Sequence, residues 1–217
     1  MHFTKSLVAA LALLAAGSAS ALDIKYTQTA GLAITTVFDD AYVQDYLTGG
    51  MQYQLLGSTG SFEAFCIELG QSHAVSGYQA YTAGSFGNAQ AGLLQGLFSS
   101  SYASLTTQQD KAAFQTAIWE ITHETSGTLD AASGNFQFAY LNLGSSTAED
   151  AAFTGQVNGL LQLAASYQGV PKYTLTKLES GTYQDLLTVS AVPEPESYAL
   201  LLAGLAAIGF VARRRAR

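Results

Sequence analysis

The amino-acid sequence predicts an α+β domain, with a mainly antiparallel β-sheet or sandwich and two to three helices. Short β-rich segments separated by turns fill residues 23–69, helical segments follow, and a last hairpin closes the domain before residue 190. Strands followed by helices, without regular alternation of the two, are typical of this fold class. Residues 22–190 are enough for one domain with its own core, whereas two domains would be crowded.

The first strands are bounded by turn signals at residues 48–50 and 57–60, both of which contain two glycines. The β-rich segments around these turns are residues 24–27, 32–38, 51–56 and 62–69. Cys66 lies on the last of them. Neither face of that strand is cleanly apolar, so Cys66 either ends a meander or hairpin, or lies at a strand-to-helix junction.

A helix over residues 108–124 is the strongest secondary-structure prediction. Thr107 precedes it and Asp110 follows three residues later, in the manner of a capping box. Its expected core stripe consists of Phe114, Ala117, Ile118 and Ile121. Gln115 and Trp119 are four residues apart, so they stack on one neighbouring face. A polar amide beside an indole at the edge of an apolar stripe calls for an explanation.

The remaining segments complete the domain. A short apolar helix is expected over residues 89–98 and a long helix over residues 147–166. The side chains expected on the inner face of the long helix are Val157, Leu160, Leu161 and Leu163. The segments expected to be loop or strand are 70–88 and 127–144, and the closing strands are 173–178 and 183–189.

Residues 1–21 have the features of a secretory signal peptide. Lys5 precedes an apolar run over residues 7–16, and Ala19 and Ala21 supply the small residues that a signal peptidase requires. Cleavage is therefore expected after Ala21. The apolar run is too short to span a bilayer comfortably, which makes a membrane anchor the weaker interpretation.

The tail at residues 191–217 has three parts: Pro193-Glu194-Pro195, an apolar stretch over residues 198–211, and an arginine cluster at Arg213, Arg214, Arg215 and Arg217. Fourteen helical residues would cover only about 21 Å of a bilayer core of roughly 30 Å, so the expected transmembrane helix is short or transient. The arginines would hold its end in the cytoplasm.

These three parts, in this order, resemble the PEP-CTERM sorting signal of Gram-negative bacteria that make extracellular polysaccharide. The resemblance implies that an exosortase processes the tail near Pro193. It also implies export to the cell surface or an extracellular, biofilm-associated matrix, with a transient anchor in the inner membrane. The alternative is a plain C-terminal anchor.

Charge and composition exclude several functions. Residues 22–192 contain four lysines, no arginine and fourteen acidic residues, which leaves a net charge of about −10. An acidic surface without a basic cluster argues against binding to nucleic acid or to anionic lipid, so membrane contact is expected only through the unprocessed tail. Paired metal ligands, phosphate-binding glycine loops and paired catalytic carboxylates are not convincingly present, so we expect no metal and no cofactor.

Cys66 is the only cysteine. In an exported chain it cannot form an internal disulfide, so it is buried, pairs with another molecule or has a dedicated chemical role. The runs Phe65-Cys66-Ile67-Glu68 and Phe114-Gln115-Thr116-Ala117-Ile118-Trp119 together resemble the two motifs of the thioester domains of bacterial surface adhesins. The motifs are in the right order and cover ten positions, within a domain-level resemblance over about residues 22–190.

The resemblance implies an internal thioester between Cys66 and Gln115, formed by thiolate attack on the carboxamide with loss of ammonia. A nucleophile admitted later, a lysine amine in the first place or else a hydroxyl, would take the acyl group of Gln115. The protein would then be a single-use covalent linker for adhesion and not a turnover enzyme. The side chains expected to shield the bond from water are Phe65, Phe114, Ile118 and Trp119.

Two further residues are candidates for proton transfer. Glu68 could accept a proton during bond formation, or it could orient a backbone N–H, or it could simply be solvated. His123 lies four residues beyond Trp119 on the same helical face, so it either assists proton transfer or is an exposed helix histidine.

Two other functions compete with the thioester. A cysteine hydrolase would pair Cys66 with His73 or His123 as base, but no family signature for one surrounds Cys66. A non-catalytic β-rich biofilm matrix or carbohydrate-binding protein would have a buried, inert Cys66, which is the usual state of a single cysteine. This second alternative is the serious rival.

Overall fold

The computed structural model describes residues 21–29, 32–38, 42–141, 144–192 and 208. Nearly all of the predicted signal peptide, and the predicted C-terminal transmembrane helix except Ile208, lie outside the described residues. Within the described part of the chain, no helix is both long and apolar enough to cross a membrane.

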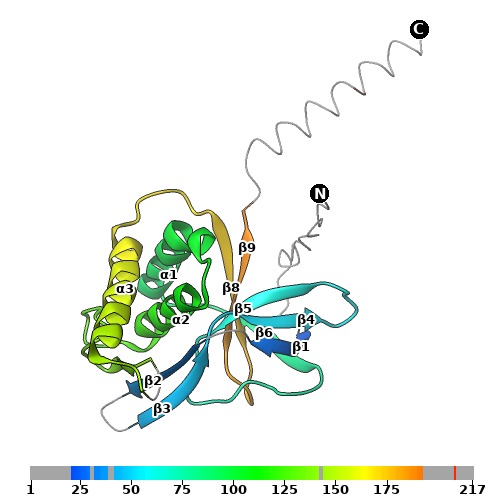
Figure 1. Cartoon of the computed structure of the whole chain (residues 1–217). Coiled ribbons are helices and arrows are strands. Elements are labelled where there is room, and N and C mark those ends of the chain that lie inside the picture. The colour runs from blue at the N-terminus through cyan, green and yellow to red at the C-terminus, as the bar shows by residue number, and fades with distance from the viewer. Residues whose placement is uncertain (1–20, 30–31, 39–41, 142–143, 193–207, 209–217) are drawn as a thin grey trace, which may run out of the picture.

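Six antiparallel strands form a closed barrel in the order β1-β4-β5-β9-β8-β6 (Figure 1). Their bounds are β1 Leu22–Thr29, β4 Met51–Leu55, β5 Ser61–Cys66, β6 Gln79–Gly84, β8 Tyr173–Glu179 and β9 Leu186–Ala191. The first and last strands of the domain thus belong to one barrel, which brings residues near position 185 beside residues near position 66. The closing hairpin predicted from the sequence is the pair β8–β9, although β9 begins at Leu186 and not at residue 183.

A second sheet has three antiparallel strands in the order β3-β2-β7. Their bounds are β2 Leu32–Phe38, β3 Tyr42–Thr48 and β7 Phe136–Tyr140. Strand β3 was not predicted, because Gln44 and Asp45 interrupt any clear alternation of apolar and polar residues there. Strand β7 lies inside the segment predicted to be loop or strand.

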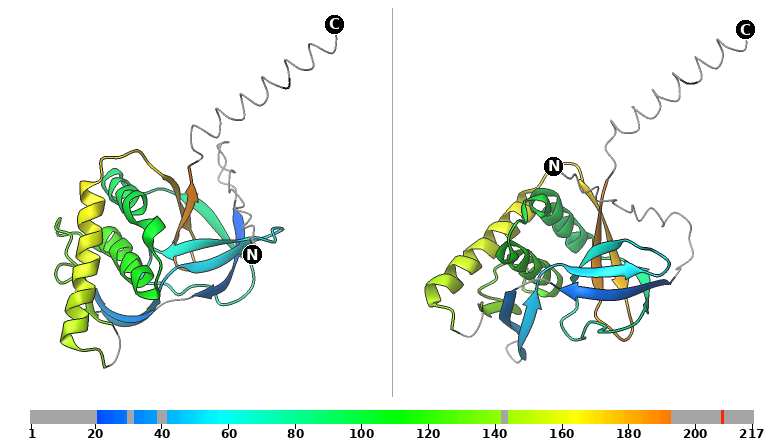
Figure 2. Two further views of the ribbon diagram at one scale, coloured as in Figure 1. Left: turned by 45° about the horizontal axis from the view of Figure 1, so that its top comes forward. Right: turned by 45° about the vertical axis from the view of Figure 1, so that its right-hand side comes forward.

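Three helices lie together on one side of the strands in all the views (Figure 1 and Figure 2). They are α1 Asn88–Ser101, α2 Gln108–His123 and α3 Thr147–Ser166, with the short 3-10 helix η1 Tyr102–Ser104 after α1. Both α1 and α2 pack against α3. The α1–α3 contact is so close that a Cβ atom at Gly96 would collide with the carbonyl oxygen of Ala164. The predicted fold class, α+β with a mainly antiparallel sheet and two to three helices, is confirmed.

The capping box predicted for α2 is present. The Thr107 hydroxyl accepts a hydrogen bond from the Asp110 N–H at 3.0 Å, and the Asp110 carboxylate accepts from the Thr107 N–H at 2.9 Å. The predicted core stripe of α2 is buried throughout. A second capping box, between Ser146 and Glu149, starts α3.

The inner face predicted for α3 is only partly correct. Val157 and Leu161 are buried as expected. Leu160 is only partly buried and Leu163 is 51% exposed. Helix α3 packs on α1 and α2 along one narrow stripe, so a leucine two residues away from Leu161 points outward.

Three phenylalanines join β5 to the helices. The rings of Phe65 (β5), Phe98 (α1) and Phe114 (α2) are fully buried, and their centroids are 4.9 to 5.5 Å apart in every pairing. Aromatic contacts of this geometry add to the free energy gained by burial alone. They hold the end of β5 against the middle of α2. Strand β5 ends at Cys66, three residues earlier than predicted, and a loop follows it.

A buried carboxyl group on α2 should make the stability pH-dependent. Glu120 is 0% exposed, its Oε1 accepts from the Asp130 N–H at 2.8 Å, and its Oε2 has no partner within the described residues. Burial, helped by the nearby Glu124 and Asp130 carboxylates, raises the pKa of Glu120 from 4.5 to about 7, although the hydrogen bond from the Asp130 N–H opposes the increase. The folded protein therefore holds a proton that the unfolded chain has already released between these two pH values. Its stability falls as the pH rises through this window.

We predict that Glu120→Gln removes this loss of stability. From acidic to mildly alkaline pH, the free energy of unfolding of the variant should rise by on the order of 1–2 kcal/mol relative to that of wild type. One pKa unit is worth about 1.4 kcal/mol, and solvent screens part of the effect. Urea unfolding below pH 4.5 and above pH 7 measures it. Glu124→Gln is the control. Burial opposes ionisation there, but hydrogen bonds from backbone N–H groups outweigh burial and lower the pKa of that carboxyl, so its variant should become less stable relative to wild type as the pH rises. If the stability of both variants changed with pH in the same way, the raised pKa of Glu120 would not be the cause of the pH dependence.

Candidate functional site

Cys66 and Gln115 are in direct contact. The Cys66 N–H donates to Gln115 Oε1 at 3.1 Å, and Gln115 Nε2 donates to the Cys66 carbonyl oxygen at 2.7 Å. Cys66 ends β5 and Gln115 lies in the middle of α2, so two elements 49 residues apart are joined by one carboxamide. Both residues are buried, at 6% and 1% exposure. The two side chains that the sequence pairs are thus brought together.

This pairing has chemical consequences. The backbone N–H of Cys66 already donates to the oxygen that would carry negative charge if a nucleophile attacked the Gln115 carboxamide carbon. The nitrogen that would have to leave is held by the Cys66 carbonyl. One side chain is therefore fixed in orientation, with its carbon beside the residue that bears the thiol.

The Cys66 sulfur has two acceptors for its single proton. Sγ lies 2.9 Å from the Glu68 carbonyl oxygen and 2.9 Å from Gln184 Oε1. Burial raises the pKa of the Cys66 thiol to about 12, although its bond to Glu68 and the Trp119 indole oppose the increase. The sulfur is therefore a neutral thiol in this state.

Trp119 places a buried donor next to the sulfur. Its indole N–H is close enough to help lower the thiol pKa, yet it has no hydrogen-bond partner of good geometry within the described residues. The ring packs on Tyr46, with centroids 5.0 Å apart, and on Phe136 at 6.3 Å. A buried N–H without a partner is costly, so it is suited to a group that becomes more negative during a reaction.

A cavity of about 390 Å³ opens onto these groups. Its lining comes from Tyr26, Thr29, Tyr46, Leu47, Gly49, Met51, Cys66, Leu69, Gly70, Gln71, Ser72, His73, Val75, Gln115, Trp119 and Gln184. No lysine, arginine, aspartate or glutamate is among them. The His73 ring contacts the Tyr26 ring at a tilt of 50°, with centroids 4.6 Å apart. Burial lowers the pKa of the His73 imidazole, which keeps it neutral.

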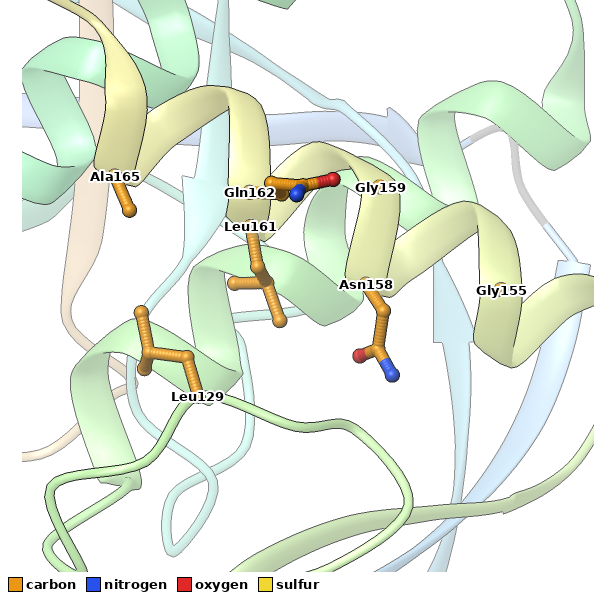
Figure 3. A pocket seen from close by; sticks show the side chains of 7 residues that line it. All are labelled: Leu129, Gly155, Asn158, Gly159, Leu161, Gln162 and Ala165. Atoms are coloured by element: carbon orange, nitrogen blue, oxygen red, sulfur yellow. The ribbon is translucent and has the colours of Figure 1, made fainter.

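A larger cavity, of about 490 Å³, lies along α3 and contains no comparable group (Figure 3). It is lined by Leu129, Gly155, Asn158, Gly159, Leu161, Gln162 and Ala165. Asn158 is occupied by the neighbouring loop, because it donates to Asp130 Oδ1 at 2.8 Å and accepts from the Ala131 N–H at 2.9 Å. Cys66, Gln115 and Trp119 thus line the cavity of about 390 Å³ and not this one.

The four side chains expected to shield the bond are all buried. Of these, only Trp119 lines the cavity beside Cys66. Phe65 and Phe114 belong instead to the aromatic cluster that joins β5 to the helices. Their contribution is to hold Cys66 and Gln115 in place, while Ile118 is part of the fully buried core.

Neither expected proton-transfer group lies among the residues that line the cavity. Glu68 Oε1 accepts from the Gly70 N–H at 2.8 Å, which is the backbone-orienting alternative, and it is the Glu68 carbonyl that contacts the sulfur. His123 Nδ1 is bonded to the Thr122 hydroxyl at 2.9 Å and contacts the Trp119 carbonyl at 3.2 Å. Within the described part of the chain, no group of three or more side chains could hold a metal ion.

Gln184 is the site residue that sequence analysis missed. It lies 118 residues from Cys66 and contacts the sulfur directly. The register of β5 on β9 pairs Cys66 with Leu186, which brings Gln184 to the same end of the barrel. A single glutamine before a strand gives no local signal, so only the closure of the barrel identifies it.

The site thus belongs to an α+β domain with a Cys–Gln contact at one end of an antiparallel barrel. Residues 191–215 match a family described as the PEP-CTERM protein-sorting motif, which confirms the predicted sorting signal and indicates an exported protein sorted to the cell envelope. No curated protein matches the chain.

Two solved structures are similar to the domain. One is the N-terminal domain of the Streptococcus pyogenes pilus tip adhesin Cpa, with 16% identity, a TM-score of 0.47, and coverage of 81% of this chain and 100% of that chain. The other is the N-terminal thioester domain of a surface protein from Clostridium perfringens, in a cysteine-to-alanine mutant. It has 14% identity, a TM-score of 0.41, and coverage of 77% of this chain and 100% of that chain.

The two hydrogen bonds of Gln115 should be visible as stability even when no thioester can form. In a Cys66→Ala background, Gln115→Ala should lower the free energy of unfolding by roughly 2–4 kcal/mol, because a buried N–H and a buried carbonyl both lose this partner. Urea unfolding measures the difference. Gln109→Ala is the control, since Gln109 on the same helix makes only an exposed contact with Gln156 and should change stability by less than about 0.5 kcal/mol. Equal effects would show that the Gln115 contact contributes nothing.

Proposed function

We propose that this chain is an exported surface or extracellular-matrix protein in which Cys66 and Gln115 form an internal thioester that captures a nucleophile covalently. The observation that carries the proposal is the buried Gln115 carboxamide, held by two hydrogen bonds to the backbone of the only cysteine. These bonds stabilise the fold, and they also place the carboxamide carbon beside the residue that bears the thiol. The proposed bond between Gln115 and Cys66 explains why the sequence places a polar amide beside Trp119.

The bond forms by acyl transfer within the fold. The Cys66 sulfur attacks the Gln115 carboxamide carbon, so a sulfur–carbon bond forms and the carbonyl electrons move to Oε1, which the Cys66 N–H stabilises. The carbon–Nε2 bond then breaks. The thiol proton leaves with Nε2, and the products are the thioester and one ammonia.

Capture reverses the roles of the sulfur. An amine or hydroxyl enters the cavity and attacks the same carbon, and the carbon–sulfur bond breaks. The proton of the nucleophile ends on sulfur, which leaves a Cys66 thiol and a covalent tether through Gln115. Because the carboxamide is not regenerated, each molecule reacts once and is a linker, not a turnover enzyme. A lysine amine is the proposed natural nucleophile.

The organisation of the chain fits this function. In the proposed order, a signal peptide at residues 1–21 directs export and is removed by signal peptidase. A thioester domain at residues 22–190 carries the reactive bond. The tail at residues 191–217 anchors the chain in the inner membrane until an exosortase processes it. The natural setting would be adhesion within a Gram-negative, polysaccharide-rich biofilm.

A second candidate, a non-catalytic β-rich matrix or carbohydrate-binding protein, is favoured by one observation. The Cys66 thiol is buried and its pKa is raised to about 12, as expected for an inert cysteine. This candidate leaves the Gln115 carboxamide intact at all times. The two functions therefore differ in whether the protein contains an electrophile.

Methylamine distinguishes them. The exported protein, incubated with methylamine and then analysed by mass spectrometry under denaturing conditions, should gain the mass of one methylamine, with the adduct on Gln115 and a newly titratable thiol at Cys66. The gain is independent of how the two ends of the chain are processed. An unchanged mass, with Gln115 intact, would contradict the thioester and favour the matrix or carbohydrate-binding function.

Two variants serve as controls for this reaction. Cys66→Ala and Gln115→Ala should each abolish the adduct, because each removes one partner of the thioester. Gln71→Ala, at an exposed residue lining the same cavity, should leave it intact. An adduct that persists in Cys66→Ala would show that methylamine reacts elsewhere.

A further inference from the structure

We propose that Gln184 is a third member of the bond-forming site, whose carboxamide binds the Cys66 sulfur both as a thiol and as a thiolate. This inference rests on the proposed thioester and names a residue that acts on its reacting atom. Gln184 has a contact with that atom that Gln115 does not show: its Oε1 lies 2.9 Å from Cys66 Sγ.

The position of Gln184 is fixed by its backbone. Its N–H donates to the Ser72 carbonyl at 3.2 Å, and its carbonyl accepts from the Tyr81 hydroxyl at 3.4 Å. The next residue, Asp185, accepts from the Ile67 N–H at 3.0 Å. The segment that follows Cys66 is therefore tied to the chain at Gln184. The Gln184 side chain, only 7% exposed, points at the sulfur.

The other end of the Gln184 carboxamide has a poor partner. Nε2 lies 3.2 Å from the thioether sulfur of Met51, which is a weak acceptor. A buried amide N–H normally has an oxygen partner, since an unmade hydrogen bond is costly. The Tyr53 hydroxyl also lies close to this side chain, and a hydroxyl can either donate or accept a hydrogen bond. A half-turn of the terminal torsion therefore exchanges Nε2 and Oε1 at little loss.

That half-turn matches the two states that the sulfur needs. In the resting state Oε1 accepts the S–H, as observed. Once the proton has left, an acceptor facing the sulfur is repulsive and a donor is favourable, so Nε2 turns toward it. The thiolate is the nucleophile when the thioester forms and the leaving group when it opens. The unpartnered Trp119 N–H supplies a second donor on the same sulfur.

The neighbouring charges show why such a donor is needed. The groups that face the sulfur are neutral: the Glu68 carbonyl, the Gln184 carboxamide and the Trp119 indole. The phenols of Tyr53 and Tyr81 are also near Cys66, and burial raises the pKa of each, so they too are uncharged. The nearest formal charges, on Glu68 and Asp185, are negative and disfavour a thiolate. Within the described residues around the cavity no cation compensates, so amide and indole N–H groups must do so.

Gln184→Glu tests the proposal with almost no change of shape, because a carboxylate accepts a hydrogen bond but cannot donate one. Methylamine capture should be slower by roughly 10- to 100-fold, the equivalent of a hydrogen bond to a charged group. Gln184→Met, which removes both donor and acceptor, should slow it similarly and serves if the glutamate variant does not fold. Gln109→Glu adds the same charge at an exposed position of α2 that does not line the cavity, and should stay within about twofold of wild type.

A second measurement does not require the thioester. In a Gln115→Ala background, the rate of Cys66 alkylation by iodoacetamide, followed against pH, reports the thiolate fraction. Adding Gln184→Glu should lower this rate by roughly tenfold or more at each pH and move the profile to higher pH, whereas Gln109→Glu should not. Equal profiles, or equal capture rates, for the Gln184 and Gln109 variants would overturn the role of Gln184. If the wild-type protein did not capture methylamine at all, the proposal of a thioester would be contradicted instead.

Discussion

The pair of hydrogen bonds between the Gln115 carboxamide and the backbone of Cys66 is the constraint on which this structure depends. The pair joins strand β5 of the barrel to helix α2, and both residues are buried. The residue before each partner is a phenylalanine. The rings of Phe65 and Phe114 contact each other, with centroids 5.4 Å apart, so the same core contact that packs β5 on α2 also aligns the two reactive residues. Packing and chemistry are thus set by adjacent positions.

Helix α2 carries an unusual number of buried polar groups for a core helix. Gln115, Thr116 and Glu120 are all buried, and the Trp119 indole N–H and Glu120 Oε2 lack partners within the described residues. The Thr116 hydroxyl is satisfied within the helix, by the Ala112 carbonyl at 2.8 Å. Groups left without partners cost stability, and they cluster within five residues of the proposed bond. Such a distribution is expected where a site, and not only a core, has been built.

Local sequence signals predicted the elements well and their assembly poorly. The capping box at Thr107 and Asp110 predicted the start of α2, and the apolar spacing within α2 predicted its buried stripe. The barrel could not be predicted, because its closure depends on β1 and β9, which are far apart in sequence. For the same reason Gln115 could be paired with Cys66 through two recognisable motifs, whereas Gln184 had no motif of its own. His123 shares a helical face with Trp119, but its ring is held by Thr122 and does not line the cavity.

In the proposed site the sulfur of Cys66 is covalently bonded to the carboxamide carbon of Gln115. A crystal structure of the exported protein tests this bond most directly. Continuous electron density between the two atoms at single-bond length, with no density for Gln115 Nε2, is the predicted result. A gap of van der Waals length, about 3.5 Å or more, with an intact carboxamide on Gln115, would contradict it.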